Sequence, residues 1–308
     1  IRDSLSVTQG GTSGRIVAAD GGLVTVTANY GDLNPGDTHT LEWDSALSGL
    51  DYVTIDGATV TVDPSTLGDT LMTASATVTD DGNPILSASD SVVVKILATA
   101  PALGADDSDG DGISDADEGY GDSDNDGIPD YLDNIDESNL APVGDSGDVV
   151  QTSAGTTIVL GDTAFSSGNN EVGIDESDVG SADADWDYLG GLVDFKVSGG
   201  QAGATYNVVI PLSGTVPAGA VLRKFMGDNI GWQDFVENAT NAIHSAMATS
   251  GTCPEPGSAA YAPGLPTADV MTPEQTICLE LLIEDGGPND MDGVCLLYTS
   301  DAADESVR

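Results

Sequence analysis

Alternation between apolar and polar residues is the dominant pattern in the first 98 residues. It recurs in five short segments, at residues 14–30, 38–47, 52–64, 70–84 and 89–97. Successive side chains of a strand point to opposite faces, so a period of two predicts strands with one buried face. Glycine-containing turn sequences at 20–22, 55–59 and 80–84 separate these segments and favour hairpins. The pattern therefore predicts an antiparallel β-sandwich over residues 1–98, with Trp43 and Tyr52 in its core.

The β pattern stops near residue 99 and returns at about residue 140. Apolar runs rich in β-branched residues lie at 149–161, 192–199, 205–214, 220–226 and 278–286. A helix at 232–247 is only weakly indicated, because Asn, Thr and Ala dominate that segment. We therefore expect a second β-sandwich over residues 141–294. The predicted fold class is all-β, with two sandwiches joined over residues 99–140 by an Asp-rich linker that has little regular secondary structure.

Charge excludes two classes of partner. The chain has 52 acidic and 7 basic residues, for a net charge of −45. Phosphate backbones and anionic membrane surfaces are bound by clustered Lys and Arg, so no nucleic acid partner is expected. The longest uncharged span, residues 197–222, is interrupted by glycine and proline, so no membrane span is expected in this fragment either.

The strongest chemical signal lies between residues 106 and 137, where 14 of 32 residues are acidic and none is basic. Two consecutive twelve-residue loops place oxygen ligands at positions 1, 3, 5, 7, 9 and 12, with glycine at position 6. The predicted ligands are Asp107, Asp109, Asp111, Ile113, Asp115 and Glu118, then Asp122, Asp124, Asp126, Ile128, Asp130 and Asp133. The two isoleucines contribute backbone carbonyls, and we expect their side chains to pack inward. Such a shell suits calcium, because magnesium requires a tighter octahedron.

The segment DSDGDGISDADEGYGDSDNDGIPDYLDN resembles the thrombospondin type 3 repeat. That resemblance implies Asp-rich turns wrapped around calcium, without the helices of a helix–loop–helix calcium site. Residues 1–98 resemble immunoglobulin-like and polycystic-kidney-disease-like modules of bacterial surface proteins, notably in DLNPGDTHTLEW and ATVTDDG. In residues 141–294 the order of GWQDF, CPEPGS and IEDGGPND resembles the choice-of-anchor U domain, which implies display at the cell surface and supplies no catalytic residue.

The three cysteines are best explained once the end of the chain is set aside. Residues 295–305 resemble a translated sequencing adapter, with an ordinary acidic tail as the alternative, so 295–308 is treated as adapter-derived. Cys253 and Cys278 then remain, flanking a stretch rich in proline and glycine. We expect a disulfide between them, which suits an oxidising compartment, and two free buried thiols are the alternative.

Enzymatic signals are weak. His39 and His244 are the only histidines, and Gly144-Asp145-Ser146-Gly147 resembles a serine-protease segment only in part, because Asp148 follows it. We therefore expect no enzyme, but a calcium-stabilised structural or adhesive segment of an extracellular or cell-surface bacterial protein. Expected partners are calcium ions and either surface polysaccharide or another surface protein. The alternative is a non-catalytic carbohydrate- or protein-binding part of a larger extracellular hydrolase.

Overall fold

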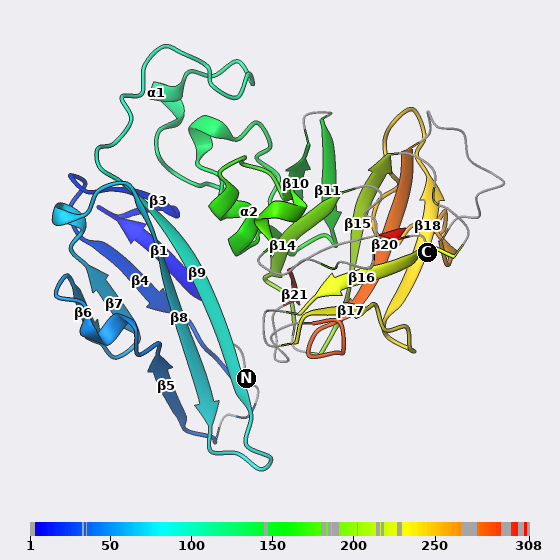
Figure 1. Cartoon of the computed structure of the whole chain (residues 1–308), viewed down its shortest axis with the longest axis horizontal. Helices are drawn as coiled ribbons and strands as arrows, with labels where there is room; N and C mark the ends of the chain where they lie inside the picture. Colours follow the sequence, from blue (N-terminus) through cyan, green and yellow to red (C-terminus); the bar gives the residue numbers. More distant parts are fainter. Residues whose placement is uncertain are drawn as a thin grey trace. The chain divides into compact units, whose positions relative to one another are not determined.

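The protein is described by a computed structural model that is predominantly β-sheet (Figure 1). It describes residues 4–32, 34, 36–144, 147–179, 183, 186, 191–201, 203–213, 216, 219–226, 230–265, 276–290, 297–300 and 305–306, with the backbone course alone at 213, 297–300 and 305–306. Among these residues the α-helices are two and short, α1 (Asp115–Glu118) and α2 (Asp162–Ser167). The predicted all-β class is confirmed.

The chain divides into two compact units, residues 1–136 and 137–308. The first unit contains two sheets, and the alternating valines and threonines of their strands give each sheet one buried face. One sheet has the order β2 (Thr12–Ser13), β1 (Leu5–Gln9), β4 (Val24–Ala28), β7 (Thr59–Val62) and β6 (Val53–Asp56). The other has the order β3 (Ile16–Ala18), β9 (Ser87–Leu97), β8 (Thr70–Asp80) and β5 (His39–Trp43). Two 3₁₀ turns, η1 (Leu47–Gly49) and η2 (Pro64–Thr66), lie between strands.

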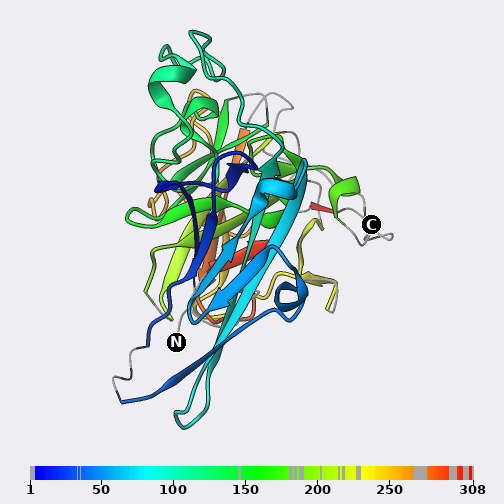
Figure 2. The same cartoon turned by 90° about the vertical axis from the view of Figure 1, so that its left-hand side faces the viewer.

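The core of the first unit is built from side chains that alternate along these strands. In β4 and β7, Val24, Val26, Val60 and Val62 are fully buried, whereas the threonines between them are only partly covered. Trp43 and Tyr52 pack against this core as half-buried side chains. The β8–β9 hairpin is the longest pairing of this unit, and β5 runs beside its turn end, with His39 opposite Asp80 (Figure 2). All strand pairs of this unit are antiparallel except β3 with β9, which is parallel.

The acidic insert follows β9 and groups with the first unit. Between residues 98 and 137 its regular elements are α1 and the single 3₁₀ turn η3 (Asp130–Leu132). Aspartate side chains, and not a backbone ladder, accept most of the hydrogen bonds within its loops. The insert therefore depends on its carboxylates for its shape.

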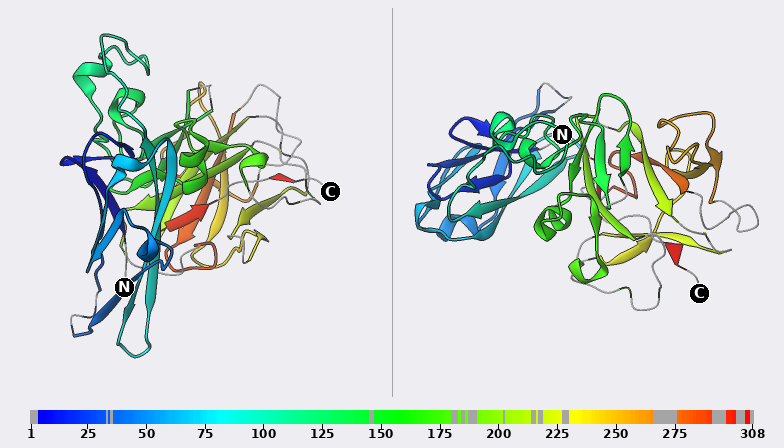
Figure 3. Two further views of the ribbon diagram at one scale, coloured as in Figure 1. Left: turned by 60° about the vertical axis from the view of Figure 1, so that its left-hand side comes forward. Right: turned by 90° about the horizontal axis from the view of Figure 1, so that it is seen from above.

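The second unit is built from sheets seen from two directions in Figure 3. The largest has the order β10 (Leu140–Val143), β11 (Asp148–Thr152), β15 (Thr205–Ser213), β20 (Thr276–Glu284), β18 (Ala242–Met247) and β19 (Ala262–Pro263). A further sheet joins β12 (Thr157–Leu160), β14 (Leu192–Ser198) and β13 (Gly173–Ile174), with β21 (Leu297–Ser300) also on β14. A third joins β17 (Trp232–Asp234), β16 (Val221–Phe225) and β22 (Glu305–Ser306), and a 3₁₀ turn, η4 (Glu176–Asp178), follows β13.

Residues 232–247 contain two strands, and two cysteines of this unit are bonded. The weak prediction of a helix at 232–247 is wrong. Strands β17 and β18 lie in that segment, and β18 pairs with β20 from Ala242 to Met247. Sheet pairing thus overrides the local preference. Cys253 and Cys278 are joined by a disulfide, with their Cα atoms 5.5 Å apart. Cys278 is fully buried in β20 against Val209 and Tyr261, so the bond fastens the loop between β18 and β19 to the core.

Candidate metal centre

The first acidic loop gathers three carboxylates at one point. Asp107, Asp109 and Asp111 each offer an oxygen atom, and these atoms lie within 4.8 Å of one another. The geometry comes from the loop's own backbone. The N–H of Asp111 donates to Asp109 Oδ1 at 3.1 Å, and the N–H of Ile113 donates to Asp111 Oδ1 at 2.6 Å. These local bonds turn alternate side chains inward, as the spacing predicted.

The second loop repeats this arrangement. Asp122, Asp124 and Asp126 form an equivalent group within 4.8 Å, and Ile128 N donates to Asp126 Oδ1 at 2.7 Å. Position 6 has φ of +98° at Gly112 and +99° at Gly127, a backbone conformation that favours glycine. The sharp reversal expected at position 6 is therefore present in both loops.

Position 9 closes each loop through a serine at position 2. Both oxygens of Asp115 accept hydrogen bonds from Ser108, one from its N–H and one from its hydroxyl, each at 2.9 Å. Asp130 accepts the same pair from Ser123, at 2.7 and 2.9 Å. Asp115 and Asp130 were predicted as metal ligands, and the structure places them as clamps of the loop ends. Sequence reasoning missed the serines, although their identical position in the two loops was a visible signal.

The acids at position 12 face the clustered carboxylates. The Oε2 atom of Glu118 is buried, and no described residue hydrogen-bonds to it. Four aspartate oxygens share this condition across the two loops, namely Asp109 Oδ2, Asp122 Oδ1, Asp124 Oδ2 and Asp126 Oδ2. A buried carboxylate oxygen without a donor is costly unless a cation compensates it. This set of orphaned oxygens fits a bound metal ion.

The pKa values of several acids in the two loops are raised by burial and by the neighbouring carboxylates. Loss of solvent, followed by the charges of Asp124 and Asp133, raises the pKa of Asp126 to about 9. Desolvation first and Asp124 second raise the pKa of Asp122 to about 7, and the pKa of Asp133 is likewise raised to about 7. In the first loop, desolvation and then the charge of Asp109 raise the pKa of Glu118. A divalent cation would reverse these shifts.

The two loops differ in exposure, which the sequence did not predict. Ile128 is 1% exposed, as expected for an inward-facing side chain, but Ile113 is 48% exposed, so that expectation is wrong for the first loop. The acids follow the same division, since Asp122 and Asp126 are buried whereas Asp107 and Asp111 are exposed. Asp136, absent from the predicted ligands, adds its charge to those that raise the pKa values of Asp124 and Asp133.

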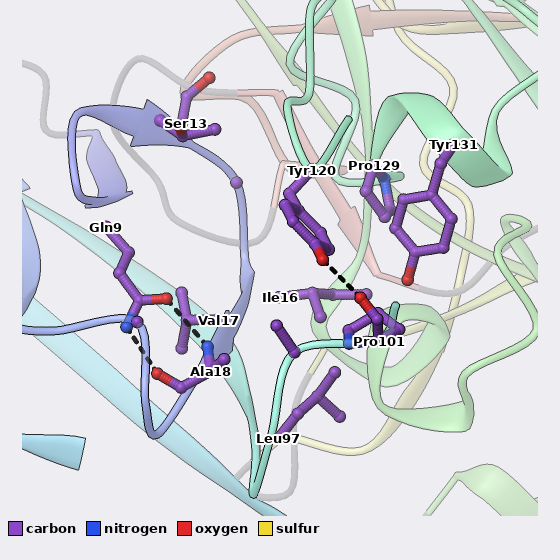
Figure 4. A pocket seen from close by; sticks show the side chains of 14 residues that line it. Gln9, Ser13, Ile16, Val17, Ala18, Leu97, Pro101, Tyr120, Pro129 and Tyr131 are labelled. Atoms are coloured by element: carbon purple, nitrogen blue, oxygen red, sulfur yellow. Dashed lines mark hydrogen bonds between the residues drawn. The ribbon is translucent and has the colours of Figure 1, made fainter. Parts of the chain in front are cut away.

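The second loop is buried because it packs on the edge of the first sandwich. Ser13 Oγ donates to the carbonyl of Asp122 at 3.3 Å, and Tyr120 OH donates to the carbonyl of Pro101. A pocket of about 200 Å³ lies between the insert and the edge of the sandwich, and its lining includes Ile16, Leu97 and Tyr131 (Figure 4). The insert and the sandwich edge thus form one packed body within the first unit.

Other candidate groups serve structural roles. At the end of the second unit, Asn289 Oδ1 accepts a hydrogen bond from Lys224 Nζ at 2.8 Å, and desolvation lowers the pKa of Lys224 to about 8. Arg223 pairs with Asp183 at 2.8 Å and with Asp234 at 2.6 Å, so it offsets neighbouring carboxylates.

The two histidines belong to different units. His244 Nδ1 lies 3.1 Å from Glu280 Oε2, and His39 Nε2 lies 3.2 Å from Asp32 Oδ2. Asp145 and Ser146 of the protease-like segment lie outside the described residues. None of the helices in the described part of the chain is long and apolar enough to cross a membrane. No family model, curated protein or solved structure matches the chain.

Proposed function

We propose that this chain is a calcium-stabilised structural or adhesive segment of a bacterial cell-surface or secreted protein. The observation that carries the proposal is the set of buried, undonated carboxylate oxygens in two loops of identical construction. Each loop would hold one cation through its acids at positions 1, 3 and 5, its position-7 carbonyl and its position-12 acid. The bound ion would supply charge compensation and no chemistry.

Calcium fits these loops better than magnesium. All ligand atoms are oxygens, and calcium accepts six to eight of them in flexible geometry. Two oxygens on opposite sides of a calcium ion lie roughly 4.6–5.2 Å apart, because each Ca–O distance is ~2.3–2.6 Å. The carboxylate oxygens of each group lie within 4.8 Å of one another, a separation compatible with that shell.

Calcium binding would order the two acidic loops. Without a cation the 14 acids of residues 106–137 repel one another, and the loops should open. If calcium is present at ~100 times its dissociation constant, each site stabilises the ordered form by ~2.7 kcal/mol. Sites in extracellular modules bind at ~0.1–1 mM, which suits external calcium levels. The disulfide in the second unit supports the same compartment.

A second candidate is a non-catalytic ligand-binding part of a larger extracellular hydrolase. The pocket beside Tyr120 and Tyr131 favours it, but its volume of about 200 Å³ is small for a ligand site. Exposed tryptophan platforms would also favour it, yet Trp43, Trp186 and Trp232 are all half-buried. Trp43 donates its indole N–H to the carbonyl of Gly57 at 2.9 Å, and Arg223 stacks over Trp186 at 4.9 Å. A structural segment therefore has the better support.

Removal of calcium tests the proposal. In the full chain, a chelator should raise protease cleavage within residues 106–137, and calcium, but not magnesium at equal concentration, should restore protection. The double variant Asp109→Asn with Asp124→Asn changes position 3 of both loops and should be cleaved even in calcium. Asp106→Asn, an exposed acid just outside the register, is the matched control and should behave as wild type. Cleavage and small-angle scattering that do not change on chelation would contradict the proposal.

A further inference from the structure

A third group of acids lies at the other end of the first sandwich. Asp32 and Asp37 belong to the loop between β4 and β5, and Asp80 is the last residue of β8. Carboxylate oxygens of the three lie within 4.8 Å of one another. Because β8 ends at the hairpin where β9 begins, the group lies at the opposite end of that sheet from the insert, which follows β9 (Figure 1). None of its members was singled out by the sequence analysis.

Asp80 is the member that points to a ligand. It is 4% exposed, and its Oδ1 accepts hydrogen bonds from the N–H of Gly82 at 3.2 Å and of Leu86 at 2.7 Å. Its Oδ2 atom is also buried, but no described residue donates to it. A buried carboxylate that is only half satisfied requires compensation from a cation or a donor. Asp80 therefore presents one free oxygen to the other two acids.

Asp32 and Asp37 complete the oxygen set. The side chain of Asp32 is 4% exposed, and its Oδ1 accepts from Asn34 N at 2.8 Å. His39 Nε2, at 3.2 Å from Asp32 Oδ2, is the one basic side chain in contact with the group among the described residues. A single imidazole cannot balance three carboxylates at neutral pH. The group thus carries an excess of negative charge around the buried Asp80, while Asp32 and Asp37 are partly buried.

Glycine 82 leaves the space between these carboxylates open. A Cβ atom at this position would lie 2.6 Å from Asp37 Oδ2 and 3.4 Å from Asp80 Oδ2. Any larger residue would therefore displace the Asp37 carboxylate.

We propose that Asp32, Asp37 and Asp80 bind a third divalent cation of the calcium type. The donors are all oxygens, and they lie within 4.8 Å of one another, which is compatible with the shell of a calcium ion, as in the insert. The ion joins the β4–β5 loop to the start of the β8–β9 hairpin, so it orders one end of the sandwich while the insert orders the other. This inference is independent of the insert, because the residues are different and lie at the far end of the sheet.

The test measures how many calcium ions each chain binds and which segments calcium protects from hydrogen exchange. In the full chain, equilibrium dialysis against millimolar calcium measures bound ions, and hydrogen exchange measures protection of residues 30–40 and 78–88. Asp37→Asn should remove one ion per chain and abolish the calcium-dependent protection of these two segments. Protection of residues 106–134 should remain. The isosteric variant keeps the backbone contacts of the loop, so folding should be preserved.

A second variant and a control keep the result interpretable. Gly82→Ala retains all three carboxylates but crowds them, and it should also remove one ion. Asp51→Asn changes an exposed acid of the same sandwich and should leave the count unchanged. The proposal is overturned if Asp37→Asn and Gly82→Ala bind as many ions as wild type, or if calcium does not protect residues 30–40 and 78–88 in the wild-type chain.

Discussion

At the scale of single residues, the same aspartate can have opposite effects on stability with and without a cation. Asp126 is fully buried, and desolvation, followed by the charges of its neighbours, raises its pKa to about 9, whereas Asp111, at the same position of the first loop, is exposed. A buried charge costs more when unpaired and contributes more when paired than an exposed one. The second loop, which is the more buried, should therefore contribute more to calcium-dependent stability than the first loop.

We expect Asp126→Asn to stabilise the first unit in chelator and to destabilise it in calcium. Without a cation the wild-type chain must protonate Asp126 on folding, because its pKa is raised to about 9, and the neutral amide removes that cost; in calcium the amide removes a charged metal ligand. Calcium affinity of the second loop should fall more than tenfold, or more than ~1.4 kcal/mol. Asp111→Asn is the matched control, and its effects should be several times smaller. Thermal unfolding and calorimetric titration measure both quantities, and equal effects of the two variants would contradict this view.

How far the sequence could predict the site also depends on individual residues. Positions 1, 3 and 5 were predictable because their geometry comes from hydrogen bonds within a few residues, as between Ile113 and Asp111. The exposure of Ile113 and the burial of Ile128 depend on packing against the sandwich, which local spacing does not encode. Asp32 and Asp80 are far apart in the chain, and only the pairing of β5 with β8 brings them together.

At the scale of secondary-structure elements, a buried acid fixes the start of a helix. Asp194 of β14 is 1% exposed, and its Oδ2 accepts from the N–H groups of Thr163 at 2.7 Å and Ala164 at 2.9 Å, at the first turn of α2. Desolvation and then the charge of Asp162 raise the pKa of Asp194 to about 6, although its hydrogen bonds and Lys196 act in the other direction. Gly161 allows this approach, since a Cβ atom there would lie 2.0 Å from Asp194 Oδ1.

This raised pKa gives a testable dependence on pH. The folded state keeps its proton up to about pH 6, whereas the unfolded state loses it near 3.8. The stabilising contribution of protonated Asp194 is thus full below pH 3.8 and lost as the pH rises through 6. Relative to wild type, Asp194→Asn should become more stable between pH 4 and 6, by an amount on the order of 2 kcal/mol. Denaturant unfolding measures the difference, with exposed Glu237→Gln as a control that should show none.

At the scale of the whole molecule, the two units depend on different chemical supports. The first contains the acidic loops, and the second contains the disulfide between Cys253 and Cys278. The sequence already separates the two supports. The acidic loops lie before residue 137, and the cysteine pair lies after it. The two supports should therefore fail under different conditions.

Differential scanning calorimetry should show two transitions that respond separately. Chelator should lower only the melting temperature of the first unit. Reducing agent, or Cys253→Ser with Cys278→Ser, should lower only that of the second, by the equivalent of ~3 kcal/mol. A single transition that moves under both treatments would instead mean that the units unfold together.

The parallel pairing of β3 with β9 has a consequence for a segment held under tension. The partners are Ile16 with Lys95, Val17 with Ile96 and Ala18 with Leu97, and they join the beginning of the sandwich to its last strand. Force applied at the two chain ends of the sandwich pulls these strands in opposite directions along their own axes. The backbone hydrogen bonds between β3 and β9 are then loaded together in shear, and they do not break one after another from one end. Because these bonds share the load, the β3–β9 pairing should resist stretching more than a pair of strands peeled apart from one end.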